Sequence, residues 1–315
     1  MPSRVPSFAK LVLALDLLLA GCLPQISPLV TAANVAGASE EEVAAPPSPA
    51  SDSVTETIAT PGPNDWQTAP VIPETLSDRA REIFTEGLAL GHNLQVFSKV
   101  GDCGGTPSWF LGPFDVGPSD YQLGEYQDLQ EVINYFQGSF GRESLAVRDG
   151  FNAAAILSPI RANHQLCKAG ETPLACEFRI NNPSIALIMV GTNDVYHVDK
   201  FEGRMRKIIE YTIDQGVLPV LASKPDNLEG DHSINRIIYS LAQEYQIPFW
   251  NVWGALQDLP GSGLQPDGAH VTFAPNYFDD ETAMQSGWPH RNLTALQVLD
   301  FLWRELEGIQ ATSTD

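Results

Sequence analysis

The sequence has few basic residues and lacks the motifs of several common ligand sites. It contains 18 Lys and Arg against 39 Asp and Glu, for a formal net charge of −21. Such a chain offers no basic patch to neutralise phosphates, which argues against nucleic acid and anionic membrane surfaces as partners. It has no G-x-x-x-x-G-K-S/T, no G-x-G-x-x-G behind a strand and no C-x-x-C, and its six histidines are scattered. We therefore predict no nucleotide, no metal and no other cofactor.

The N-terminus has the pattern of an export signal. Arg4 and Lys10 precede the apolar run 11–20, which is too short to span a bilayer but typical of a secretory signal. The sequence LAGC closes this run at Cys22 and resembles the bacterial lipobox, in which the cysteine is lipidated and becomes the new N-terminus. This resemblance predicts an extracytoplasmic protein at the bacterial cell surface, with a membrane as partner through the lipid on Cys22. The alternatives are a plain signal peptide cut nearby and an uncleaved anchor.

Composition divides the chain into three predicted parts. Residues 1–22 form the signal peptide with its lipobox. Residues 23–75 are rich in Pro, Ala, Ser and Thr and contain no Lys or Arg. Such a segment buries too little apolar surface to offset its chain entropy, so we predict a disordered acidic tether. Residues 76–310 show periodic apolar patterns and form the predicted folded domain.

The folded part alternates between the two kinds of secondary structure. Apolar runs of strand length occupy residues 94–100, 184–190, 217–223 and 247–253, and apolar residues at helical spacing occupy 126–136, 201–213, 234–245 and 293–306. Strands that alternate with helices predict an α/β fold, a three-layer α/β/α sandwich with a central parallel sheet.

Four polar segments follow the predicted strands or lie in neighbouring loops: Gly101-Asp102-Cys103, Asp149-Gly150-Phe151-Asn152, Gly191-Thr192-Asn193-Asp194 and Asp267-Gly268-Ala269-His270. The GTND sequence directly after a buried strand, with a late D-x-x-H before the final helix, resembles the SGNH (GDSL-type) hydrolase family. The resemblance covers about residues 90–307. It implies a flavodoxin-like sheet and the hydrolysis of acyl esters.

Ester hydrolysis needs a nucleophile, a base, a group that orients the base, and donors for the oxyanion. His270 can act as the base, and Asp267 can hold its other ring nitrogen. Asn193 carries a side-chain amide suited to an oxyanion hole. The resemblance adds the backbone N–H groups of Cys103 and Gly150 to that hole. The carboxylates of Asp102 and Asp194 are expected to accept hydrogen bonds from loop backbone instead.

Position 103 departs from the family, because the motif serine is replaced by Cys103. This thiol is a nucleophile activated by His270, or the residue of a disabled site, or a structural or redox group. Ser98 lies in the middle of the strand and is not expected to reach the sheet edge. If Cys22 is lipidated, Cys167 and Cys176 are close enough in sequence to close a local disulfide, which leaves Cys103 as the free thiol.

The sequence does not decide whether the substrate is a lipid ester or an acylated carbohydrate. The alternatives to an enzyme are a catalytically silent surface module that recognises envelope glycans or esters, and a structural lipoprotein. Six aromatic residues of the loops line a cleft or pack the loops together, namely Trp109, Phe110, Phe114, Tyr277, Phe278 and Trp288. The spacing does not decide whether His290 and Arg291 edge the site.

Overall fold

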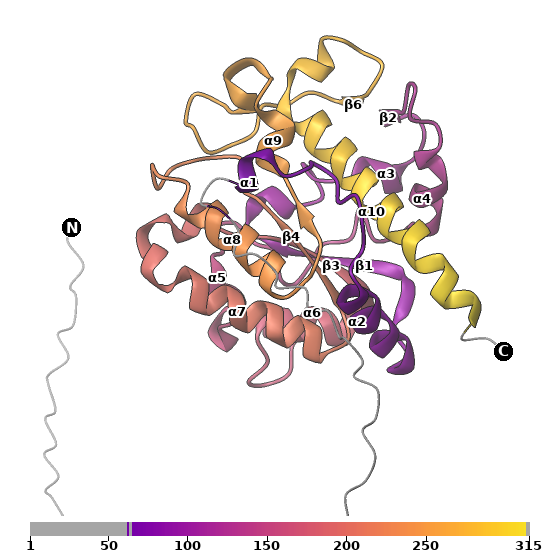
Figure 1. The fold of residues 1–315 in the computed structure, drawn as a ribbon, viewed down its shortest axis with the longest axis vertical. Coiled ribbons are helices and arrows are strands. Elements are labelled where there is room, and N and C mark those ends of the chain that lie inside the picture. Colours follow the sequence, from indigo (N-terminus) through magenta and orange to yellow (C-terminus); the bar gives the residue numbers. More distant parts are fainter. Residues whose placement is uncertain (1–61, 63–64, 313–315) are drawn as a thin grey trace, which may run out of the picture. The chain divides into compact units, whose positions relative to one another are not determined.

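The computed structural model describes residue 62 and residues 65–312 (Figure 1). The predicted signal peptide, Cys22 and residues 23–61, 63 and 64 of the predicted tether lie outside the described residues. Within the described part, no helix is both long and apolar enough to cross a membrane.

The core of the fold is a four-stranded parallel sheet of the order β1-β3-β4-β5. Its strands are β1 (Asn93–Gly101), β3 (Pro183–Met189), β4 (Leu218–Ala222) and β5 (Phe249–Trp250). Gly101 also forms an isolated parallel bridge with Val147. With Val147 in the place of a further strand, the order corresponds to the flavodoxin-like order 2-1-3-4-5. The predicted α/β class and parallel sheet are confirmed.

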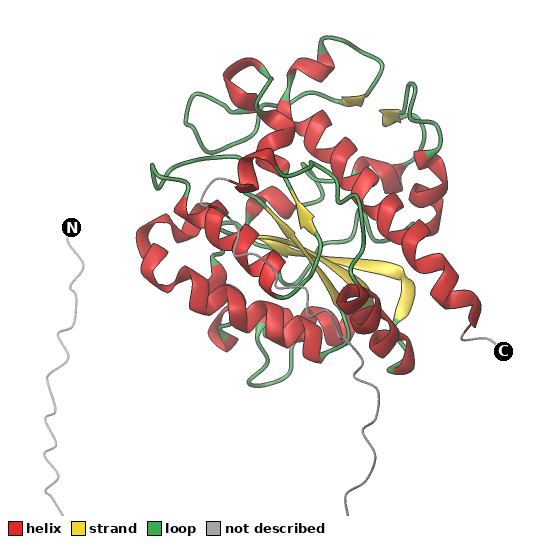
Figure 2. Cartoon of the chain, viewed as in Figure 1, coloured by secondary structure: helices red, strands yellow, loops and turns green. Residues whose placement is uncertain are grey.

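Helices cover both faces of this sheet, which explains why every residue of β3 and β4 is buried (Figure 2). On one side α10 packs against α2, α4 and α9, and on the other α7 packs against α5 and α8 (Figure 1). The helices are α1 (Asp65–Thr68), α2 (Asp78–Ala89), α3 (Pro113–Val116), α4 (Leu129–Tyr135), α5 (Ala153–Ile156), α6 (Pro173–Asn181), α7 (Val198–Asp214), α8 (Ser233–Glu244), α9 (Val252–Leu256) and α10 (Gly287–Thr312).

The N-terminal boundary of the folded part differs from the sequence prediction, which assigned residues 65–75 to the tether. Trp66 is only 1% exposed, and its ring centroid lies 4.7 Å from that of Trp253. Asn251 Nδ2 donates to Trp66 O and Ala69 O at 3.0 and 2.9 Å. Because these contacts fix the segment on the domain, the folded part includes residues 65–75 and does not start at residue 76. The buried Trp66 side chain anchors this segment to the domain, although its Pro-rich composition is typical of a tether.

Two long loops are joined to each other beside the main sheet. A short parallel pair connects β2 (Tyr121–Gln122), in the loop after β1, with β6 (Asn276–Tyr277), in the loop before α10. A disulfide between Cys167 and Cys176 closes a third loop, as the sequence predicts. The β2–β6 pair therefore ties the loop that follows β1 to the loop that precedes α10.

Candidate active site

The turn after β1 holds Cys103 at the carboxyl edge of the sheet. A Cβ at Gly101 would lie 2.3 Å from Met189 O, so only glycine allows this close approach of β1 and β3. Asp102 then caps the short 3-10 helix Cys103–Gly105, and its Oδ1 accepts a hydrogen bond from Gly104 N at 2.9 Å. Asp102 thus has the expected backbone role, and the turn presents the neighbouring thiol.

The turn after β3 holds Asn193 close to this first turn. Asn193 Nδ2 donates to Phe151 O at 3.0 Å and to Asp102 Oδ2 at 3.4 Å. Asp194 is buried and accepts a hydrogen bond from Ala153 N at 3.0 Å. Burial raises the pKa of the Asp194 carboxyl. The structure therefore brings Asn193 to the site and gives Asp194 a structural contact.

Asp267 and His270 form a pair on a turn before α10. Asp267 Oδ2 lies 2.6 Å from His270 Nδ1, and Asp267 Oδ1 accepts hydrogen bonds from the backbone N–H groups of Ala269 and His270 at 3.0 Å each. These backbone bonds, together with the one from the imidazole, hold the pKa of Asp267 at about 2. The side chains of His270 and Asp267 are 61% and 48% exposed. The carboxylate orients the ring so that Nε2 is the free nitrogen.

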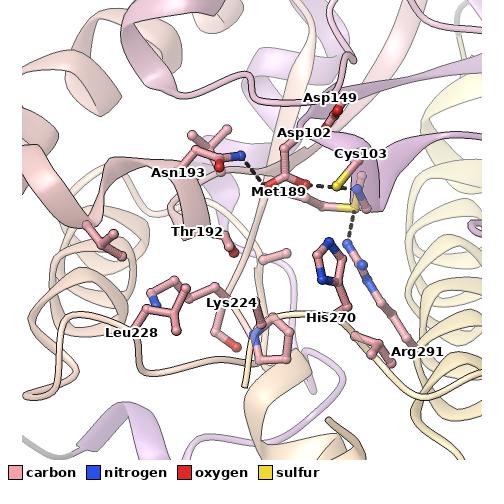
Figure 3. A pocket seen from close by; sticks show the side chains of 18 of the residues that line it. Asp102, Cys103, Asp149, Met189, Thr192, Asn193, Lys224, Leu228, His270 and Arg291 are labelled. Atoms are coloured by element: carbon pink, nitrogen blue, oxygen red, sulfur yellow. Dashed lines mark hydrogen bonds between the residues drawn. The ribbon is translucent and has the colours of Figure 1, made fainter. Parts of the chain in front are cut away.

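These segments meet in one pocket of about 280 Å³ (Figure 3). Its wall includes Cys103, Asn193 and His270, which come from three separate loops. Among the described residues, however, no hydrogen bond joins the Cys103 sulfur to His270. Gly150 is exposed and does not line the pocket, although its neighbour Asp149 does. The predicted nucleophile, base and side-chain amide are therefore brought together, and Gly150 remains outside the wall.

The thiol of Cys103 is half-buried and not part of a disulfide. Burial raises its pKa, and the negative charges of Asp102 and Asp149 raise it further. The sulfur is therefore a thiol at neutral pH and needs a base to become a nucleophile. Ser98 is fully buried and donates to Glu177 Oε1 at 2.6 Å, so it cannot replace Cys103.

Two buried cationic side chains also line the pocket, Lys224 and Arg291. Lys224 Nζ lies 2.5 Å from both Asp226 Oδ1 and Glu229 Oε2, so its charge is neutralised. The sequence gives no signal for Lys224 and leaves the place of Arg291 undecided. Among the described residues, the only grouping of possible metal ligands is Cys167, Glu171 and Cys176, and the disulfide occupies both of its sulfurs.

The site thus combines a free thiol, a histidine–aspartate pair and a side-chain amide in one pocket of an α/β fold. No family model matches the chain. No curated protein matches it either.

Solved structures similar to this chain include proteins described as GDSL-type hydrolases. A GDSL-like lipase from Bacteroides thetaiotaomicron is 16% identical, with a TM-score of 0.42, over 71% of this chain and 98% of that one. A putative acylhydrolase from Bacteroides fragilis is 16% identical, with a TM-score of 0.43, over 72% and 99%. A putative lipolytic protein of the G-D-S-L family from Desulfitobacterium hafniense is 14% identical, with a TM-score of 0.39, over 65% and 99%.

Proposed function

We propose that this protein hydrolyses acyl esters through Cys103, with His270 as base and Asp267 as its orienting group. The observation that carries the proposal is the convergence of Cys103, Asn193 and the His270–Asp267 pair on one pocket. A nucleophile, an oriented base and an amide donor within one pocket are what acyl transfer requires.

The first half of the reaction would acylate the thiol. The Cys103 proton passes to His270 Nε2 as the sulfur bonds to the ester carbonyl carbon, and the oxygen takes the negative charge. One side-chain N–H of Asn193, released from its 3.4 Å contact with Asp102 Oδ2, and the backbone N–H of Cys103 stabilise this oxyanion. The backbone N–H of Gly150 is a further candidate donor. When the carbonyl reforms, the C–O bond to the alcohol breaks, and His270 gives its proton to the leaving oxygen.

The second half would release the acid. Water attacks the thioester as its proton passes to His270, and the sulfur leaves and recovers that proton. Because no hydrogen bond joins Cys103 to His270 in the described structure, the cycle also requires a rotation of the exposed His270 side chain. Its exposure leaves room for this movement.

The experiment is a comparison of wild type with Cys103→Ser, Cys103→Ala and His270→Ala on p-nitrophenyl acetate and butyrate. We expect wild-type turnover that iodoacetamide abolishes, and a loss of about 10²–10⁴-fold in His270→Ala, the usual contribution of a general base. The exposed His164 supplies the matched control, His164→Ala, which should keep wild-type activity. Equal rates in wild type and His270→Ala would refute the proposal.

A second candidate function is a silent binding module for envelope esters or glycans. It is favoured by the raised pKa of Cys103 and by the missing bond between this thiol and His270. For this candidate, the wild type would be inert and Cys103→Ser would gain activity. The same set of variants therefore separates the two functions.

The rim of the pocket suits a lipid ester or an acylated carbohydrate as substrate. Trp109 and Phe273 are 47% and 61% exposed, and their rings meet edge to face at 5.5 Å. Trp109 also stacks on Trp288, which lines the pocket. Exposed aromatic rings beside a reactive centre can bind an acyl chain or stack on a sugar.

We also propose that the protein acts outside the cytoplasm, attached to a bacterial membrane by a lipid on Cys22 and a tether that ends before residue 65. The lipobox supports the anchor, and the Cys167–Cys176 disulfide is typical of an oxidising compartment. Cys22→Ser should move the protein from the membrane to the soluble fraction. An unchanged distribution would contradict the anchor.

A further inference from the structure

Arg291 is a buried cation in the wall of the pocket, next to the nucleophile turn. It lies in α10, is 6% exposed, and lines the same pocket as Cys103 and His270. A Cβ on Gly104 would lie 2.9 Å from Arg291 Nη1, so glycine at this position allows the guanidinium to approach the turn. Figure 3 shows the guanidinium directed towards Met189, beside the imidazole of His270.

The guanidinium has little to satisfy its five N–H donors. Arg291 Nη2 donates to Met189 Sδ at 3.1 Å, and a thioether is a weak acceptor. Arg291 Nε is buried without a hydrogen-bond partner. No carboxylate of the described residues forms an ion pair with Arg291. The rings of Phe110 and Trp288, with centroids 4.9 and 5.1 Å from its Cζ, hold the group in place.

A buried cation without a direct ion pair is unfavourable, so an anion is the group that completes this environment. Burial lowers the pKa of Arg291 only to about 10, and the side chain is therefore charged at neutral pH. The Cys103 sulfur does not supply the anion, because its own pKa is raised. The carboxylate of Asp102 attracts the guanidinium electrostatically, but it forms no ion pair with Arg291 and instead accepts hydrogen bonds from Gly104 N and Asn193 Nδ2. The cation is thus available to a molecule that enters the pocket.

We propose that Arg291 binds an anionic oxygen group of the substrate, a carboxylate or a phosphate, close to the ester carbonyl at Cys103. The planar guanidinium is suited to such groups, since two of its N–H donors can reach two oxygens of one anion. That this anion belongs to a substrate rests on the proposed hydrolysis, whereas the anion site itself does not.

The anion site can be tested without catalysis, by calorimetric titration of the full-length Cys103→Ala protein. The probes are succinate, inorganic phosphate and the neutral analogue succinamide. We expect succinate or phosphate to bind and succinamide not to bind. Adding Arg291→Met should weaken anion binding at least tenfold, whereas Arg304→Met should not. Arg304 is the matched control because it lies in the same helix, is exposed and pairs with Asp300.

Gly104→Ala provides a second variant in case Arg291→Met does not fold. It keeps the charge but places a methyl group 2.9 Å from Arg291 Nη1, so it should also weaken anion binding. Unchanged affinity in the folded Arg291→Met protein, or in Gly104→Ala if Arg291→Met does not fold, would overturn the proposal. Failure of both anions to bind the Cys103→Ala protein would also overturn it.

Hydrolysis assays then show whether the preferred ester carries its anionic group on the acyl side or on the alcohol side. Monomethyl succinate is compared with methyl butyrate, and acetoxyacetate with ethyl acetate, so that each pair differs by an anionic group on the acyl or the alcohol side. We expect wild type to prefer one anionic member, and Arg291→Met to reduce that ratio at least tenfold. If succinate binds but all esters are inert, the proposed function fails and the anion site stands. If neutral esters are hydrolysed but no anion binds, the site fails and the function stands.

Discussion

The substitution Asp267→Asn tests how the pocket uses its histidine. Asp267 Oδ2 accepts the Nδ1 proton of His270 at 2.6 Å, which leaves Nε2 free to take a proton from Cys103. In Asp267→Asn, the amide oxygen can keep the backbone bonds to Ala269 and His270, so the turn should persist. The amide N–H₂ then faces Nδ1, and the ring must carry its proton on Nε2. That tautomer cannot act as a base towards the thiol.

The size of the loss follows from the exposure of the pair. The same substitution in the buried triad of serine proteases reduces kcat by about 10⁴-fold. Here the two side chains are 61% and 48% exposed, so water competes for Nδ1 and gives the ring more freedom to turn. We therefore expect a smaller loss, about 10²–10³-fold in kcat, with KM changed little.

The assay is steady-state hydrolysis of p-nitrophenyl acetate, with far-ultraviolet circular dichroism to verify folding. Asp258→Asn, at an exposed aspartate, is the matched control and should behave as wild type. Since the pKa of Asp267 is about 2, its carboxyl is negatively charged above that pH and becomes protonated only below it. Activity between pH 4 and 9 should therefore show no titration of Asp267. Wild-type kcat in Asp267→Asn would refute the role of the pair.

Three further predictions concern other parts of the molecule. Asn193→Ala should reduce kcat by about 10²–10³-fold, as for the loss of one oxyanion donor, and an effect on KM alone would contradict that role. The pH dependence of Cys103 alkylation by iodoacetamide, followed by mass spectrometry, should have its midpoint at a higher pH than that of free cysteine. Asp149→Asn should lower this midpoint. A midpoint below that of free cysteine would contradict the described environment of the thiol. Trp66→Ala should lower the free energy of unfolding in urea by about 3–5 kcal/mol. A change below about 1 kcal/mol would show that residues 65–75 are not part of the folded domain.

The parts of the site that could be predicted lie where the chain leaves a strand. Cys103 and Asn193 follow β1 and β3, and parallel strands bring their carboxyl ends to one edge of a sheet. Asp267 and His270 are only three residues apart, so one turn is enough to join them. Local spacing and one topological rule therefore account for their convergence.

The residues that escaped prediction depend on packing between distant segments. Arg291 reaches the pocket because α10 begins at Gly287, earlier than the apolar pattern from residue 293 indicates. Trp66 is buried against Trp253, which is far away in sequence. Neither contact produces a periodic pattern in the sequence. Nothing in the sequence shows that a buried arginine lacks an ion pair.

The turn that carries His270 is held mainly by hydrogen bonds between its own residues. Gln265 N donates to His270 O at 2.7 Å and Gly268 N to Gln265 O at 2.9 Å, while Leu264 and Val271 form a single antiparallel bridge. The side chains of residues 265–270 are exposed or half-buried, so this part of the turn can open locally while the sheet stays intact. For a hydrolase built this way, moderate heating would remove the base before it melts the core. Activity would then disappear reversibly at a temperature below the cooperative unfolding transition.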